Sequence, residues 1–282
     1  MQAYLNGKMM PYEDARASAQ SKGLQEGGLY DRARTFNGKA FKLRRHLERL
    51  INSFAFAQIE SSMSMVDLEE ATLKVLETNL PLLSDGSEFV VTQLVSRGLA
   101  SSLDETPEVN VFIYCEPLEF REFAAGYLTG VRLITPTTYG VPRQGSEGTR
   151  EEREQQTLSL MSTPEGILTE CEGANFMLVE DGRIKLPDRS NVLPGISMET
   201  VLELAEGLGI PIDEGEYSTY HAYKADEAFI SSTRHCMLPV ATINGLRVGT
   251  ELPGPVTRRL LEAWRDLVEV DFVREALDAS RS

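Results

Sequence analysis

Two Asn-Gly dipeptides, each beside short strand-like runs, constrain the fold of this chain more than any other feature. Asn6-Gly7 separates residues 2–5 from residues 8–11, and Asn37-Gly38 ends the apolar run 28–36. Asn-Gly readily adopts the positive φ angles that a two-residue hairpin turn requires. Each dipeptide therefore predicts an antiparallel β-hairpin, which excludes an all-helical fold.

Helical patterns follow these predicted hairpins. Apolar residues recur at helical spacing from Leu43 to Phe54. A second helix is expected from Ser64, because Ser64 and Asp67 have the spacing of a capping box, and it ends by Pro81. Residues 88–96 and 109–115 are rich in Val, Phe, Ile and Tyr and are expected to be strands. This mixture predicts an α+β domain, which we place at residues 1–117.

The rest of the chain is again rich in strand-like runs. We expect residues 118–130 to connect two domains and residues 131–282 to form a strand-rich α/β domain. Helices are expected from the Pro194-Gly195 turn to Gly209 and from Gly254-Pro255 onward. The expected strands of this domain are 131–135, 157–162, 174–180, 183–186, 227–232 and 238–243.

Composition excludes several classes of function. The chain has 43 acidic and 28 basic residues, and a net charge of −15 repels polyphosphate, so no nucleic acid partner is expected. Three scattered cysteines lack metal-ligand spacing and predict free thiols in a reducing compartment, with no metal. No apolar run approaches the roughly 20 residues of a membrane span, and no signal peptide is recognisable. We therefore expect a cytoplasmic protein.

Nine segments in a fixed order resemble the class IV aminotransferases, which are pyridoxal-phosphate (PLP) enzymes of fold type IV. This family includes branched-chain and D-amino-acid aminotransferases and aminodeoxychorismate lyase. The resemblance covers nearly the whole chain and implies a two-domain D-amino-acid aminotransferase-like fold, a PLP cofactor, a homodimer, and an amino acid or keto acid substrate. The segments are YLNGK (4–8), GLYD (28–31), FNGKAF (36–41), HLERL (46–50), GILTE (166–170), NF (175–176), LPGIS (193–197), ADEAF (225–229) and GPVT (254–257).

Two elements are predicted to bind the cofactor phosphate. The Pro194-Gly195 turn leads into a helix whose first N–H groups, at Ile196 and Ser197, suit an anion. The resemblance implies this use, and the alternative is merely a well-capped helix. Arg49 matches the family's phosphate-binding arginine, whose planar guanidinium can hold two oxygens at once. The alternative for Arg49 is a helix arginine that faces solvent.

The resemblance assigns three further cofactor residues. Ser232 and Thr233 match small residues near the phosphate, although they could equally be an ordinary strand end. Glu170 matches the carboxylate that keeps the pyridine nitrogen protonated, with Glu172 as the weaker candidate. The alternative for Glu170 is a surface glutamate after a hairpin.

Substrate contacts are expected on the strand that carries Tyr30, Arg32 and Arg34. By resemblance, alternate positions of this strand face the substrate, and the arginines could bind its carboxylate. The alternative is that Asp31 and the arginines of the same strand neutralise one another.

The lysine that the family requires is not where the resemblance places it. That lysine holds PLP as a Schiff base and then moves a proton on the substrate carbon. The corresponding region spans residues 135–156, and no lysine occurs between Lys74 and Lys185. Thr138 and Thr149 are candidates for its position, but neither can form a Schiff base.

The catalytic residue therefore stays unassigned. Lys185 is a weak surrogate for the missing lysine, and the alternative is an exposed strand lysine. Two hypotheses follow. The chain either keeps a PLP cradle with divergent or impaired aminotransferase or lyase chemistry, or it binds another anionic ligand without PLP, through lysine-independent chemistry or as a non-catalytic binding protein.

Overall fold

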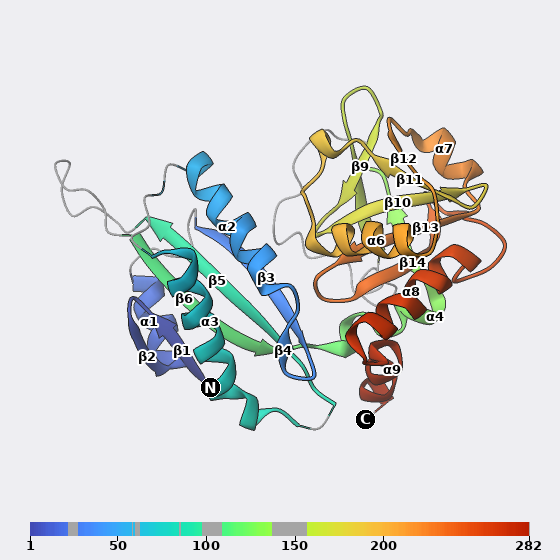
Figure 1. Ribbon diagram of the computed structural model, residues 1–282. Helices are drawn as coiled ribbons and strands as arrows, with labels where there is room; N and C mark the ends of the chain where they lie inside the picture. The colour runs from blue at the N-terminus through green and yellow to red at the C-terminus, as the bar shows by residue number, and fades with distance from the viewer. Residues whose placement is uncertain are drawn as a thin grey trace. The chain divides into compact units, whose positions relative to one another are not determined.

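The computed structural model describes residues 1–21, 28–57, 59, 63–84, 86–97, 109–136 and 157–281. The chain divides into two compact units, Met1–Leu118 and Glu119–Ser282, which we call unit 1 and unit 2. Both units mix helices and strands, so the predicted α+β class is confirmed (Figure 1).

Unit 1 is built on an antiparallel sheet in which the strands follow the order β2-β1-β6-β5-β3-β4. Both predicted hairpin turns are confirmed. Asn6 and Gly7 have φ angles of 46° and 88°, and Asn37 and Gly38 have φ angles of 49° and 72°. The strands are β1 (Gln2–Leu5), β2 (Lys8–Pro11), β3 (Leu29–Phe36), β4 (Lys39–Ala40), β5 (Phe89–Arg97) and β6 (Val109–Pro117).

Helices cover both faces of this sheet. The predicted helices are α2 (Leu43–Ala57) and α3 (Met65–Asn79), and the predicted capping box of α3 forms between Ser64 and Asp67. A short 3₁₀ turn, η1 (Leu80–Leu82), follows α3. The apolar faces of α2 and α3 pack on one side of the sheet. The sequence did not predict α1 (Tyr12–Ser21), which packs on the other side through small alanines rather than a strong apolar stripe.

The main sheet of unit 2 closes on itself. Its strands follow the order β12-β11-β10-β13-β14-β7-β8-β9, and β9 also pairs with β10. The six predicted strands of this unit are confirmed within two residues at each end, whereas the short β9, β12 and β15 were not predicted. The strands are β7 (Val131–Ile134), β8 (Thr157–Ser162), β9 (Leu168–Cys171), β10 (Ala174–Glu180), β11 (Arg183–Pro187), β12 (Ile212–Gly215), β13 (Glu227–Ser232), β14 (Cys236–Ile243) and β15 (Leu246–Arg247).

Two predicted helices, α6 (Ile196–Gly207) and α8 (Pro255–Val268), pack on each other and on β13. Glu227, at the start of β13, caps α8 by accepting hydrogen bonds from the backbone N–H groups of Val256 and Thr257, both at 2.8 Å. The remaining helical elements of the described residues are η2 (Phe120–Glu122), α4 (Gly126–Thr129), η3 (Arg189–Asn191), α7 (Thr219–Lys224) and α9 (Phe272–Arg281).

The segment that we expected to connect two domains, 118–130, is itself folded into helical turns. Phe120, Phe123 and Tyr127 are buried, and Tyr127 donates a hydrogen bond of 2.7 Å to the carbonyl of His235. Sequence reasoning missed this because the turns are only three and four residues long and two glycines, Gly126 and Gly130, suggested a linker, although the three aromatic residues do have helical spacing. Among the described residues, no helix is long and apolar enough to cross a membrane.

Candidate active site

Glu170, the predicted partner of the pyridine nitrogen, lies in β9 at the centre of a polar cluster in unit 2. Its Oε2 atom accepts hydrogen bonds from the Asn175 side-chain amide at 3.1 Å and from the Leu193 N–H at 3.0 Å. The same amide donates to the Leu193 carbonyl at 2.9 Å. Burial raises the pKa of Glu170, and the Leu193 hydrogen bond only partly offsets this. A cationic N–H partner would therefore be favoured beside this carboxylate.

Asn175 links this carboxylate to the start of α6. It pairs across the sheet with Glu170 on one side and with Ser231 of β13 on the other. Residues paired in this way lie on the same face of the sheet. Asn175 has no predicted role of its own in the sequence, where it occurs only within a segment shared with the family, because its partners come from three separate segments.

Gly195 is the N-cap of α6, and no side chain caps this helix. A Cβ atom at Gly195 would lie 2.0 Å from the Asn175 Oδ1 atom, so only glycine fits this close approach. Ile196 and Ser197 follow in the first turn and are nearly buried. The positive end of the helix dipole and its first N–H groups are suited to hold an anion here, as the sequence predicts.

Ser231, which the sequence analysis did not single out, is the serine of β13 that shares a face with Asn175. It is only 1% exposed, and within the described part of the chain its hydroxyl has no hydrogen-bond partner. Alternation along the strand places Ser232 on the opposite face, and Thr233 lies in the turn that follows. Both of these predicted residues are half-buried.

Lys185, the weak surrogate, lies in β11 with its ammonium group 2.8 Å from the Asp213 carboxylate. This hydrogen bond raises the pKa of Lys185, so the amine is kept protonated and is a poor nucleophile. Lys185 pairs with Leu178, whose face of β10 is opposite to that of Asn175. The polar cluster around Glu170 thus gains no lysine from this strand. Thr138 and Thr149 lie outside the described residues.

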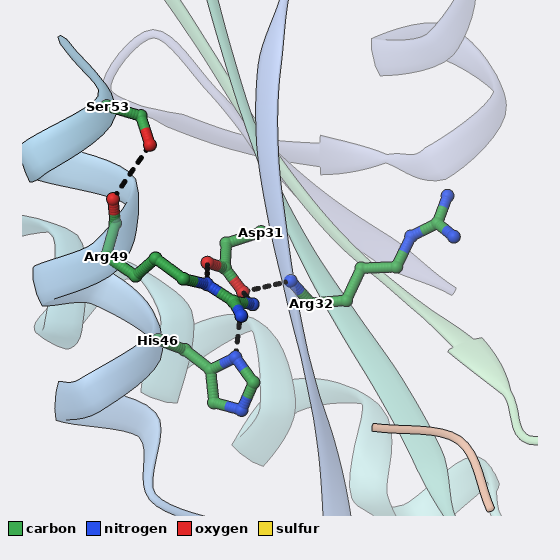
Figure 2. A network of polar contacts seen from close by, with 5 residues as sticks. All are labelled: Asp31, Arg32, His46, Arg49 and Ser53. Atoms are coloured by element: carbon green, nitrogen blue, oxygen red, sulfur yellow. Dashed lines mark hydrogen bonds and ion pairs between the residues drawn. The ribbon is translucent and has the colours of Figure 1, made fainter. Parts of the chain in front are cut away.

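Arg49, the predicted phosphate ligand, lies on α2 in unit 1 and takes part in a buried network with Asp31 and His46 (Figure 2). Its Nε and Nη2 atoms donate to the two oxygens of Asp31 at 2.7 and 2.8 Å. His46 Nδ1 lies 2.7 Å from Asp31 Oδ1, and the Arg32 N–H donates to the same oxygen at 2.7 Å. The side chain of Asp31 is 3% exposed, whereas that of Arg49 is 19% exposed.

Asp31 is therefore an ionised anchor for Arg49. Burial alone would raise its pKa, but the hydrogen bonds from His46 and Arg49 outweigh burial and hold the pKa below its usual value. The alternative interpretation, in which Asp31 neutralises arginines of its own strand, is wrong. Alternation along β3 turns Asp31 toward α2 and turns Arg32 to the opposite face, as Figure 2 shows.

The three predicted substrate residues share the other face of β3, but they differ in exposure. Tyr30 and Arg32 are exposed, and the Arg32 guanidinium lies 4.8 Å from the centre of the Tyr30 ring. Arg34 is buried, stacks on Phe36 at 4.1 Å and donates a hydrogen bond to the Thr35 carbonyl. The structure therefore leaves Arg32 better placed than Arg34 to meet a ligand from solvent.

Comparison with known proteins decides the family. The family model for class IV aminotransferases matches residues 28–243. The chain belongs to the class IV aminotransferase family. This result confirms the resemblance seen in the sequence, and the chain is an enzyme of the aminotransferase type. Enzymes of the class IV aminotransferase family depend on PLP.

The individual relatives of this class IV aminotransferase match it over most of its length. A putative branched-chain-amino-acid aminotransferase of Methanocaldococcus jannaschii is 25% identical over 291 residues, which cover 95% of this chain and 96% of the relative. A D-alanine aminotransferase of Listeria monocytogenes is 26% identical over 276 residues, covering 92% and 93%. The solved structure of the Escherichia coli branched-chain amino acid aminotransferase has a TM-score of 0.81 at 26% identity, covering 95% and 94%. The predicted fold type IV architecture is thereby confirmed.

Proposed function

We propose that this class IV enzyme holds PLP without a Schiff-base lysine at the family position and carries out divergent or impaired aminotransferase chemistry on an amino acid or keto acid. One observation carries the proposal. Glu170, Asn175 and the N-terminus of α6 form one hydrogen-bonded cluster in unit 2, with a glycine that no other residue could replace without a clash.

The residues of this cluster fit the charged parts of the cofactor. The α6 N-terminus and the buried Ser231 hydroxyl offer donors suited to a phosphate, and Glu170 offers a carboxylate suited to a protonated ring nitrogen. We also propose Arg49 as a phosphate ligand and Thr233 as a further contact, by resemblance to the family, whereas the side chain of Ser232 lies on the face of β13 opposite to this cluster. When bound, PLP supplies an electron sink for bonds at the substrate's α-carbon.

Each protein group has a distinct task in this proposal. Glu170 holds the proton on the ring nitrogen through its carboxylate oxygens, because burial disfavours the charged carboxylate unless a cation pairs with it. Asn175 fixes the position of Glu170 and of the Leu193 backbone. Asp31 holds the guanidinium of Arg49 in one orientation through two hydrogen bonds.

The cofactor would be held without a covalent bond. No lysine occurs between Lys74 and Lys185, and among the described lysines of unit 2, Lys185 is bonded to Asp213 while Lys224 lies over the ring of Tyr220. Without a lysine the proton transfer at the substrate carbon loses its usual base, so slow turnover is expected. A homodimer in the cytoplasm remains part of this proposal.

The test is a titration of the purified protein with PLP, followed by absorbance and thermal unfolding. We expect a saturable visible absorbance change, a raised melting temperature, and no mass increase after borohydride reduction. The variant Glu170→Gln should weaken PLP binding, whereas the matched control Glu172→Gln, at an exposed position two residues away, should not. A cofactor adduct on any lysine would overturn the lysine-free part of the proposal.

The absence of lysine between Lys74 and Lys185 also favours a second function, which is binding of a different anion without PLP. In that case PLP would produce neither an absorbance change nor stabilisation, while inorganic phosphate would still raise the melting temperature. The two functions are thus separated in one set of titrations.

A further inference from the structure

A hollow on the α1 side of the unit 1 sheet has a lining that the proposed function does not explain. Its volume is about 170 Å³, and it lies between α1 and the face of the sheet opposite to α2. A cavity of roughly 150 Å³ holds one benzene molecule, so this hollow has room for one aromatic ring.

Two parallel rows of side chains form the floor of this hollow. One row runs across three strands from Arg32 through Thr92 to Tyr114. The next row on the same face runs from Tyr30 through Leu94 to Phe112. Cross-strand pairs of this kind hold their side chains close together, so the floor is fixed by sheet register rather than by a loop.

Aromatic rings make up most of the wall. Tyr12, at the start of α1, lies 6.3 Å from Phe112 and 5.6 Å from Tyr114, measured between ring centres. Phe112 and Tyr114 stack at 4.7 Å. Flat rings already packed against one another present a surface on which a further ring can stack.

Two arginines border the same hollow. Arg32 comes from β3 and Arg16 from α1, one helical turn after Tyr12. Within the described residues, neither guanidinium forms an ion pair with a carboxylate, and Arg32 instead lies over the Tyr30 ring. Two cations without acidic partners favour an anionic ligand, and the planar guanidinium matches a carboxylate in particular.

Thr92 gives an independent indication of a ligand. It lines the hollow and is only 2% exposed, yet within the described residues its hydroxyl has no hydrogen-bond partner. A buried polar group without a partner is costly, and such groups in native proteins call for an explanation. A ligand oxygen above the Arg32–Thr92–Tyr114 row would give this hydroxyl its partner.

We propose that this hollow binds a small aromatic carboxylate. Its ring stacks on the aromatic wall, its carboxylate pairs with Arg32 and Arg16, and the Thr92 hydroxyl donates to it. Glu116 lies two residues beyond Tyr114 on the same face of β6 and repels the carboxylate from that end. This inference rests on the proposed function in one respect, because Tyr30 and Arg32 are also the proposed substrate residues of the enzyme. If both hold, the substrate class of the enzyme is an aromatic acid.

The test measures benzoate binding to the full-length protein by calorimetry, without PLP. We expect saturable binding of benzoate, with at least tenfold weaker binding of cyclohexanecarboxylate and of benzyl alcohol, which lack the aromatic ring and the charge respectively. Arg32→Gln and Arg16→Gln should each weaken benzoate binding about tenfold, and Thr92→Val about fivefold. Arg44→Gln, an exposed arginine on α2, is the matched control and should bind benzoate as the wild type does.

Two results would overturn the proposal. They are no saturable binding of benzoate, or equal binding of benzoate by the wild type and by Arg32→Gln. If benzoate does not bind and the arginine variants change their oligomeric state, this face is instead a contact between two copies of the chain. The benzoate measurement contains no PLP, so its outcome does not depend on PLP binding. A negative benzoate result therefore does not refute the proposed PLP function, and a negative PLP titration does not refute the benzoate site.

Discussion

Replacing Asp31 with asparagine tests how the buried network of unit 1 holds Arg49. Asparagine has the shape of aspartate but no charge. Its amide NH2 group replaces one carboxylate oxygen and cannot accept a hydrogen bond from Arg49 or His46. The variant removes the Asp31 charge from the Arg49 guanidinium, whose side chain is 81% buried. The Nδ1 atom of His46 loses the carboxylate that now lies 2.7 Å away.

The expected cost follows from the burial of this pair. Removing one partner of a buried ion pair costs about 3–5 kcal/mol, because the other charge stays buried without compensation. Water can reach about a fifth of Arg49, so we expect the lower end, about 3 kcal/mol. The Arg45–Glu48 pair has the same 2.7 Å separation but is half exposed, and such pairs contribute about 0–1 kcal/mol. Glu48→Gln is therefore the matched control on the same helix.

The assay must report on unit 1 alone. The only tryptophan of the chain, Trp264, lies in unit 2, so fluorescence would not detect the change. Native-state hydrogen exchange of peptides from β3 and α2 gives the free energy of opening for unit 1 directly. An equal, small effect of Asp31→Asn and Glu48→Gln would refute the claim that burial gives the Asp31 network its strength.

The stability difference between wild type and Asp31→Asn is expected to depend on pH. Because the folded-state pKa of Asp31 is below its usual value, its stabilisation is fully present above a pH of about 4 and is lost as the pH falls through the folded pKa. The difference between wild type and Asp31→Asn should therefore be constant near neutrality and shrink in acid. A difference that does not change down to a pH of about 2 would contradict this assignment.

Three further predictions concern other parts of the fold. Gly195→Ala should destabilise unit 2 by about 1–3 kcal/mol and abolish PLP binding, whereas Gly207→Ala, in open space on the same helix, should stabilise it by about 0.5–1 kcal/mol. Thermal unfolding followed by Trp264 fluorescence measures the stability of both variants, and the PLP titration measures cofactor binding. Glu227→Gln removes the charge that caps α8 and should cost about 1–3 kcal/mol in the same assay, and an unchanged melting temperature would contradict the capping role. Burial raises the pKa of Cys115 to about 12, so alkylation of native protein at pH 8 should leave this thiol unmodified while unfolded protein reacts fully, as peptide mass spectrometry would show.

Local signals in the sequence were reliable wherever the physics is local. Each Asn-Gly turn needs positive φ angles at only two neighbouring residues, and the Ser64–Asp67 capping box forms within one helical turn. Both features were therefore predicted correctly. Longer amphipathic patterns, such as that of α2, were also read correctly. The short strands β9 and β12 carry too few residues for a pattern, because their place depends on pairing with distant strands.

The sequence by itself determined the family, the mixed α+β class and the lack of lysine between Lys74 and Lys185, since each depends only on which residues occur in which order. Only the tertiary structure decided what those residues touch. It paired Asp31 with Arg49 rather than with its strand neighbours, set Asn175 between Glu170 and Ser231, and joined α1 to the sheet around Thr92. These contacts join segments that are far apart in the chain. Sheet register and burial determine them, and a local sequence pattern contains no information on either.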